Sequence, residues 1–308
     1  MGYSGEFMDG IINVYKQKGM TSHDVVARLR KIFNIKKIGH TGTLDPDAGG
    51  VLPICIGKGT KLAEYLTDKD KKYRAKLILG ITTDTQDLSG QVIEKKEVNV
   101  GEEEVKSIIM SFGGDILQIP PMFSAIKING QKLYQLARQG KTIEREKRKI
   151  RIYGIEILKI DLLHNEILFD VECSKGTYIR TLCHDIGNKI GCGGCMGSLL
   201  RIKAGEFDIT SSFSLEKIKE YFDNNKINDI LKPLDYIFLK YKSAIAKDQS
   251  LRWVLNGCRI YEKDIIFKEP FVFGEIIRIY DEQNKFLALY KVEEKDGKIE
   301  FVVEKMFA

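Results

Sequence analysis

The sequence has no apolar run of the roughly 18 residues that a membrane-spanning helix requires, and it shows no signal-peptide pattern. Its six cysteines are too sparse for a disulfide framework in 308 residues. Cys192 and Cys195 form one C-x-x-C spacing without a second pair, so a glycine-rich turn is favoured over a structural zinc site. We therefore expect no membrane association, no metal, and the reduced thiols of a cytoplasmic protein.

A phosphate-binding P-loop is also missing. The one Gly-Lys pair beside the glycine-rich stretch of the chain, Gly57-Lys58, is followed by Gly59 rather than by Ser or Thr. Leu52 stands where the first glycine of such a loop should be. A nucleotide-binding enzyme of that class is thus disfavoured.

The length and composition suit a two-domain globular protein. The chain has 308 residues, of which 43% are hydrophobic, enough for ordinary cores. We expect residues 1–7 to be an added leader and Met8 to be the natural start, because the first strand pattern follows at once. The larger domain is expected over 8–235 and a smaller one over 241–308.

Positive charge is concentrated in one segment. The formal net charge is +6, but the stretch 127–151 holds nine basic and two acidic residues, so the rest of the chain sums to −1. A local basic block on a near-neutral body favours contact with nucleic-acid phosphates over a merely solvated surface. The predicted RNA-binding residues are Lys127, Lys132, Arg138, Lys141, Arg145, Lys147, Arg148 and Lys149.

A glycine-rich stretch, GHTGTLDPDAGGVLP at 39–53, places Asp45 between two apolar segments. Its glycines permit positive φ and close approach to a ligand, and Pro46 biases Asp45 towards an extended conformation. A carboxylate held in this way can act as a nucleophile or a base. As an ordinary turn residue it would instead cap the backbone.

Apolar periodicity predicts strands and helices in alternation. Strands are expected at 11–15, 51–56, 71–79, 149–162 and 166–173, and three more strand-like runs at 275–280, 286–292 and 299–303. Helices are expected from Thr21 or Ser22 to about Phe33, from Thr60, and at 102–112, 131–139, 215–222 and 249–255. Asn129-Gly130 is a hairpin signal. A helix opened by SKGTYIRTL at 174–182 runs to about Ile190 and carries Arg180, which by position alone would be a surface charge.

These motifs resemble a known family. The pattern Gly-His-Thr-Gly-x-Leu-Asp-Pro-x-Ala-x-Gly-x-Leu-Pro is similar to the signature of bacterial tRNA pseudouridine synthases that modify the uridine at position 55 in the TΨC loop. It is matched from Gly39 to Pro53, and the family's Lys-Gly-Thr-Tyr-Ile-Arg is matched from Lys175 to Arg180. The resemblance covers roughly 10–210. Gln17 and Leu200 depart from the family's usual proline and arginine.

The resemblance implies roles for particular residues. Asp45 would be the nucleophile, Arg180 its ion-pair partner, and Tyr73 the ring that stacks on the target base and a candidate acceptor for the C5 proton. Substrate-binding positions would be His40, Tyr178, Leu199 and Lys16. From position alone, Tyr73 is a half-buried strand tyrosine and His40 a polar turn residue.

The resemblance also implies the fold, the reaction and the partner. The expected fold is α+β, a mixed and mainly antiparallel sheet with flanking helices, an RNA-gripping insertion at about 124–150, and a C-terminal β-barrel of the PUA type. A plain β-domain is the alternative for the C-terminal part. We expect a cytoplasmic monomer that isomerises uridine in tRNA by base flipping, without metal or organic cofactor. A non-catalytic tRNA-binding or tRNA-folding protein is the alternative.

Overall fold

A computed structural model describes residues 8–128, 130–267 and 269–308 of the chain. The expected leader, 1–7, lies outside the described residues, and so does Asn129 of the hairpin signal. Within the described part, no helix is long and apolar enough to cross a membrane.

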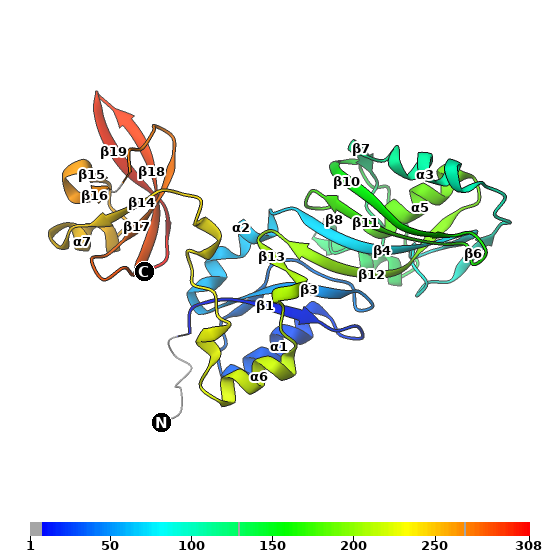
Figure 1. Ribbon diagram of the computed structural model, residues 1–308, viewed down its shortest axis with the longest axis horizontal. Helices are drawn as coiled ribbons and strands as arrows, with labels where there is room; N and C mark the ends of the chain where they lie inside the picture. The colour runs from blue at the N-terminus through cyan, green and yellow to red at the C-terminus, as the bar shows by residue number, and fades with distance from the viewer. Residues whose placement is uncertain (1–7, 129, 268) are drawn as a thin grey trace.

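The larger body is built on a nine-stranded sheet (Figure 1). β3 and β12 run parallel, while the other described pairs of this sheet are antiparallel. Two short strands, β2 (Ile38–His40) and β13 (Phe207–Asp208), pair with β3 and β12. The remaining order is β1 (Gly10–Lys16), β3 (Gly49–Ile56), β12 (Gly194–Ala204), β4 (Lys71–Leu79), β11 (Glu166–Cys173), β10 (Arg148–Asp161) and β7 (Gly114–Gln118).

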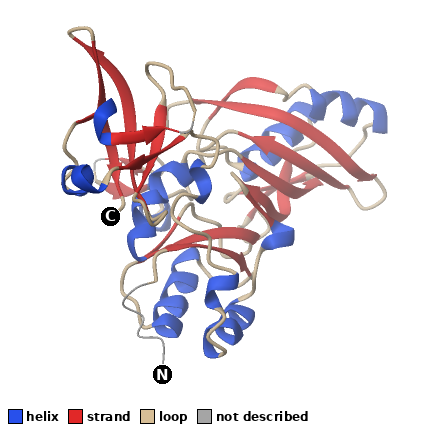
Figure 2. Ribbon diagram, turned by 60° about the vertical axis from the view of Figure 1, so that its left-hand side comes forward, coloured by secondary structure: helices blue, strands red, loops and turns tan. Residues whose placement is uncertain are grey.

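Helices cover this sheet in two places, and the two helix groups give two separate cores. α1 and α6 pack together against β1 and β3, as Figure 2 shows from the side. α3 and α5 cover β4, β10, β11 and β12. The helices are α1 (Ser22–Phe33), α2 (Ala63–Thr67), α3 (Glu102–Met110), α4 (Leu133–Arg138), α5 (Ile179–Ile190), α6 (Leu215–Asp223) and α7 (Asp248–Leu255).

The start of α1 shows how local sequence fixes an element beside the glycine-rich loop. Thr21 accepts a hydrogen bond from the Asp24 amide, and the Asp24 carboxylate accepts one from the Thr21 amide, which completes a capping box. Ser22 is buried and accepts from the amide of Leu44, one residue before Asp45. The cap of this helix is therefore joined to the candidate nucleophile loop.

The C-terminal part forms its own six-stranded sheet, which curls into a nearly closed barrel-like body (orange and red in Figure 1). An apolar cluster of Phe238, Phe286 and Phe307 packs it against the larger body. The strands in spatial order are β15 (Ile260–Tyr261), β19 (Lys298–Met306), β18 (Phe286–Lys295), β17 (Ile276–Tyr280), β14 (Ser243–Ala246) and β16 (Ile265–Phe267).

The predicted fold class is confirmed, and so are most long elements. The helix expected from Thr60 is a 3₁₀ helix (Gly57–Leu62) that continues into α2. The sequence analysis assigned no structure to 194–204, which is β12 at the centre of the sheet. It also did not predict β2 or the short strands β14, β15 and β16. The basic segment holds the hairpin of β8 (Lys127–Ile128) and β9 (Gln131–Lys132), and a second small pair joins β5 (Ile81–Thr83) to β6 (Val92–Lys95).

Gly50→Ala in β3 should destabilise the larger body. Gly50 has a φ of 108°, and an added Cβ would lie 2.2 Å from the carbonyl oxygen of Arg201 in β12. Strain at positive φ costs about 1–2 kcal/mol and overpacking about 1–3 kcal/mol, so we expect a loss of about 2–5 kcal/mol in the free energy of unfolding. Urea unfolding followed by circular dichroism measures it.

The matched control is Gly154→Ala in β10, where an added Cβ meets nothing within 4 Å. This change should alter the free energy of unfolding by less than about 1 kcal/mol. Equal urea midpoints for the two variants would contradict the close approach of β3 to β12.

Candidate active site

The loop that carries Asp45 is anchored on both sides of that residue. It leaves β2 after His40 and enters β3 at Gly49. Before Asp45, the backbone of Leu44 is tied to Ser22 Oγ by a 2.9 Å hydrogen bond. After it, the Pro46 carbonyl accepts from the Gly19 amide at 2.9 Å and from Lys16 Nζ at 3.1 Å. Asp45 is thus held between fixed points rather than at the tip of a free turn.

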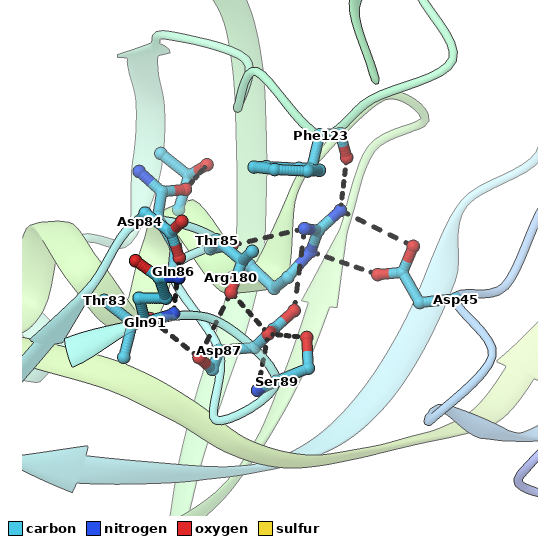
Figure 3. A network of polar contacts seen from close by, with 11 residues as sticks. Asp45, Thr83, Asp84, Thr85, Gln86, Asp87, Ser89, Gln91, Phe123 and Arg180 are labelled. Atoms are coloured by element: carbon cyan, nitrogen blue, oxygen red, sulfur yellow. Dashed lines mark hydrogen bonds and ion pairs between the residues drawn. The ribbon is translucent and has the colours of Figure 1, made fainter. Parts of the chain in front are cut away.

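Arg180, the second residue of α5, grips the Asp45 carboxylate (Figure 3). Its Nε lies 3.0 Å from Asp45 Oδ2, and its Nη2 lies 3.5 Å from Asp45 Oδ1. The Arg180 side chain is 7% exposed, whereas that of Asp45 is 39% exposed. One side of the carboxylate is therefore held by a buried guanidinium, and the other remains accessible. The surface charge expected from position alone is instead a buried partner.

Three further groups hold Arg180, and the sequence analysis named none of them as site residues. Its Nη2 donates to the Phe123 carbonyl at 2.7 Å, and its Nη1 donates to the Thr85 carbonyl at 3.2 Å. Asp87 Oδ2 lies 3.6 Å from Nη1, so two carboxylates share one guanidinium. Asp87 lies in the polar loop 84–90, to which the sequence analysis assigned no role in the site. Asp87 could have been found from its place in that loop. The contacts of the Thr85 and Phe123 carbonyls could not be predicted from residue types, because every residue has a backbone carbonyl.

The electrostatics of Asp45 reflect these neighbours. Burial raises the pKa of the Asp45 carboxyl above the ordinary 3.8, and Asp87 raises it further, while Arg180 and Lys16 oppose the rise. Arg180 is the largest of the opposing causes. The guanidinium thus favours the ionised carboxylate, which is the form that a nucleophile needs.

Two predicted tyrosines lie near the same carboxylate. Tyr73 is half-buried on β4, and Tyr178 immediately precedes α5. The charge of Asp45 acts on both phenols, and burial is the main cause that raises the pKa of each. Gln118 exchanges two hydrogen bonds with the Tyr178 backbone, at 2.8 and 3.0 Å, which fixes the start of α5. Two phenols therefore lie within the electrostatic influence of the Asp45 carboxylate.

The other predicted substrate residues surround the loop in different ways. His40 ends β2, and its Nδ1 accepts from the Gly42 amide at 3.4 Å; burial lowers the pKa of His40, which favours the neutral ring. Leu199 is buried in the same apolar cluster as Leu44. Lys16 is fully buried, and its Nζ donates to backbone carbonyls, including that of Met20 at 2.6 Å. Burial lowers the pKa of Lys16 to about 8.

Arg201 is a buried charged residue that the sequence analysis did not assign to the site. It lies in β12, is 2% exposed, and reaches the backbone of the loop that carries Asp45. An arginine in a strand is usually exposed, so its residue type gave no signal.

The predicted RNA-gripping insertion, about 124–150, begins where Arg180 is held, directly after Phe123, and contains most of the basic segment. Arg145 Nη1 donates to the Pro120 carbonyl at 3.1 Å, and Lys149 pairs with Asp115 at 3.0 Å. Lys132 and Arg138 both lie over the ring of Tyr134. Exposed positions without an ion pair among the described residues are Lys127, Arg138, Lys141, Lys147 and Arg148.

The C-x-x-C spacing gives no metal centre in the structure. In the part of the chain that is described, no three His, Cys, Asp or Glu side chains gather so that they could hold a metal ion. Cys192 lies in a turn whose Gly193 has a φ of 75°, and Cys195 is already in β12.

Comparisons with known proteins identify the family of the chain. The family model described as the N-terminal domain of TruB family pseudouridylate synthases matches residues 30–179, and that of the tRNA pseudouridylate synthase B C-terminal domain matches 180–239. Proteins named tRNA pseudouridine synthase B from Alkaliphilus oremlandii and Clostridium tetani are 46% and 48% identical to the chain. Each alignment covers 92% of this chain, and 98% and 95% of the relative.

Solved structures show the same fold. The chain is similar to a structure described as a Cbf5-Nop10-Gar1 complex, with a TM-score of 0.73 and 29% identity over 97% of this chain and 85% of that chain. It is also similar to a structure of an H/ACA RNP bound to a substrate RNA containing 2′-deoxyuridine, with a TM-score of 0.72 and 26% identity over 100% of this chain and 90% of that chain. The loop signature, the paired Asp45 and Arg180, and these matches agree: the chain belongs to the TruB family of pseudouridylate synthases.

Proposed function

We propose that this enzyme isomerises the uridine at position 55 in the TΨC loop of tRNA, with Asp45 as nucleophile. The observation that carries the proposal is the Asp45 carboxylate, gripped by Arg180 on one side and accessible on the other. A protein that only bound or folded tRNA would have no use for a fixed, accessible carboxylate facing RNA phosphates. The names of the relatives support tRNA as the substrate.

The reaction sets three requirements. The N1–C1′ bond must break, the base must turn, and a C5–C1′ bond must form, with loss of the C5 proton and gain of one proton at N1. The target base must first leave its stack, because its reacting atoms are inaccessible there. A nucleophile must then hold the nucleotide while the base turns, and a base must accept the proton.

The residues of the site meet these requirements in separate ways. Asp45 supplies the nucleophile, and Arg180 keeps it ionised and aimed. Tyr73 stacks on the extruded uracil, a contact worth about 1–3 kcal/mol per base, and is the candidate acceptor of the C5 proton. Tyr178, His40 and Leu199 contact the flipped nucleotide. Lys16 acts through the loop, because its ammonium is buried against backbone carbonyls.

Two other parts of the chain would hold the rest of the tRNA. The insertion at 124–150 presents exposed Lys147 and Arg148 just before β10, where they can neutralise phosphates. We assign 8–235 as the catalytic domain and 241–308 as a PUA-like domain that makes a second RNA contact. The enzyme would act as a cytoplasmic monomer. It would need no metal or organic cofactor, because the isomerisation is redox-neutral.

Asp45→Asn should abolish pseudouridine formation while leaving tRNA affinity within about threefold of the unsubstituted protein, because the amide keeps the shape of the carboxylate and the affinity comes chiefly from phosphate contacts elsewhere. The measurement is single-turnover conversion of an unmodified tRNA transcript, with affinity from filter binding. The matched control is Asp47→Asn, an exposed carboxylate two residues along the same loop, which should retain activity. Conversion by the Asp45→Asn protein would remove Asp45 as the nucleophile.

The single-turnover rate should fall on acidification with a midpoint above 3.8, because the raised pKa of Asp45 means that its carboxylate is lost as pH drops through that raised value. The substitution Asp87→Asn removes a charge that raises the pKa of Asp45. In this variant the acid limb of the rate profile, where the rate falls on acidification, should therefore lie at lower pH. Rates are measured across a pH series, with circular dichroism to verify folding at each point. An acid limb that does not move in this variant would contradict the shared guanidinium.

Changing both Lys147 and Arg148 to Gln should weaken tRNA binding and reduce the slope of log affinity against log salt concentration by about 1–2, since each neutralised phosphate contributes about 0.7–0.9. The control changes Lys217 and Lys219 on α6 to Gln. Both of these lysines are paired with acids on their own helix. An unchanged slope in the first variant would assign the basic segment to a solvated surface.

A further inference from the structure

Arg201 occupies the point where three strands of the large sheet meet. It lies in β12, opposite Gly50 of β3 on one side and opposite Tyr73 of β4 on the other. Directly opposed residues of antiparallel strands project their side chains to the same face. The side chain of Arg201 is therefore on the face that carries Tyr73, and Gly50 leaves the room for its backbone.

The guanidinium of Arg201 is buried and is held by backbone oxygens. Its Nε donates to the Val51 carbonyl at 2.7 Å, and its Nη2 donates to the Gly42 carbonyl at 3.4 Å. In the described part of the chain it forms no ion pair. Burying a charge without an opposite charge is costly, so a guanidinium kept in this place needs other strong acceptors.

Tyr73 stands directly opposite Arg201 on the neighbouring strand and on the same face, so its phenol is a side-chain group placed to accept from this guanidinium. A hydrogen bond and the charge of Arg201 both favour the ionised phenol, against burial, which raises the pKa of Tyr73. Cys173 from β11 and Asp45 from the loop also act on this phenol, and both raise its pKa, as burial does. The charge of Arg201 also lowers the pKa of Lys71, at the start of β4, and of His40, at the end of β2. Among the groups that act on Tyr73, Arg201 makes the largest contribution to lowering the pKa of this phenol.

We propose that Arg201 is a positioning residue that acts through Tyr73: it joins the Tyr73 hydroxyl and the Gly42 carbonyl into one rigid group. The proposal rests on the proposed function, in which Tyr73 stacks on the flipped base and Asp45, three residues after Gly42, attacks the same nucleotide. Through these two contacts, one side chain fixes the distance between the stacking ring and the nucleophile loop. Neither contact would touch the substrate itself.

A purely structural role for Arg201 is the competing explanation, and a double-mutant cycle separates the two. Single-turnover rates at saturating tRNA are measured for Arg201→Lys, Tyr73→Phe and the double variant. We expect Arg201→Lys to lower the rate about tenfold or more, the effect of losing a charge-assisted hydrogen bond, with tRNA affinity unchanged. In the Tyr73→Phe background the same change should cost less than about threefold. Rate losses that multiply would overturn the proposal.

A second measurement does not depend on activity. 3-Fluorotyrosine is incorporated, the Tyr73 signal is assigned by its loss in Tyr73→Phe, and its ¹⁹F shift is followed through an alkaline titration. Arg201→Lys, and Arg201→Gln as a second variant that keeps one N–H for Val51, should move the titration of this phenol to higher pH. The Tyr178 signal should not move. An unchanged Tyr73 titration would overturn the proposal.

The outcomes also separate this proposal from the proposed function. If the protein without substitutions forms no pseudouridine, the proposed function is wrong. The ¹⁹F titration still decides whether Arg201 holds Tyr73. Arg74→Lys is the matched control: Arg74 neighbours Tyr73 on β4 but pairs with Asp170 on β11, and this change should leave the rate within about twofold. Loss of the fold in both Arg201 variants would show that Arg201 serves the sheet as a whole, and would overturn the proposal.

Discussion

The ion pair between Asp45 and Arg180 is the interaction on which the site depends. A carboxylate beside a buried apolar cluster would tend to take up a proton, and the guanidinium opposes this. Because Arg180 is itself held by the Thr85 and Phe123 carbonyls, it cannot swing out to solvent with the carboxylate. The accessible side of Asp45 is then the side that substrate can reach, since the other is occupied by a fixed partner.

Buried positive charge is a shared property of the elements around this pair. Lys16, Arg180 and Arg201 are all less than a tenth exposed. Lys16 and Arg201 are held by backbone carbonyls, whereas Arg180 contacts two carbonyls and the carboxylates of Asp45 and Asp87. Backbone carbonyls compensate a cation without cancelling its charge, so these cations can still balance the carboxylates of Asp45 and Asp87. The interactions that order the loop therefore also hold positive charge beside Asp45.

The sequence could predict the parts of the site that depend on residue type and spacing. The glycine-rich stretch indicated an anchored carboxylate, Thr21 indicated the cap of α1, and the long strands followed from their apolar pattern. The contacts of Arg180 could not be predicted in this way, because two of its partners are carbonyls that every residue carries. Arg201 was missed for a related reason. An arginine in a strand is expected to be exposed from its residue type, and only the pairing of β12 with β3 and β4 buries it.

The position of Phe123 links the basic insertion to the ion pair of Asp45 and Arg180. Its carbonyl makes the shortest hydrogen bond to Arg180, and the basic insertion starts at the next residue. The hairpin and helix of that insertion return to the same root, since the Tyr134 amide donates to the Ser124 carbonyl at 3.1 Å. The segment that we propose to contact RNA phosphates is therefore continuous, within one peptide unit, with a group that orients the guanidinium. Any shift of that root changes a partner of Arg180, and through Arg180 the aim of Asp45.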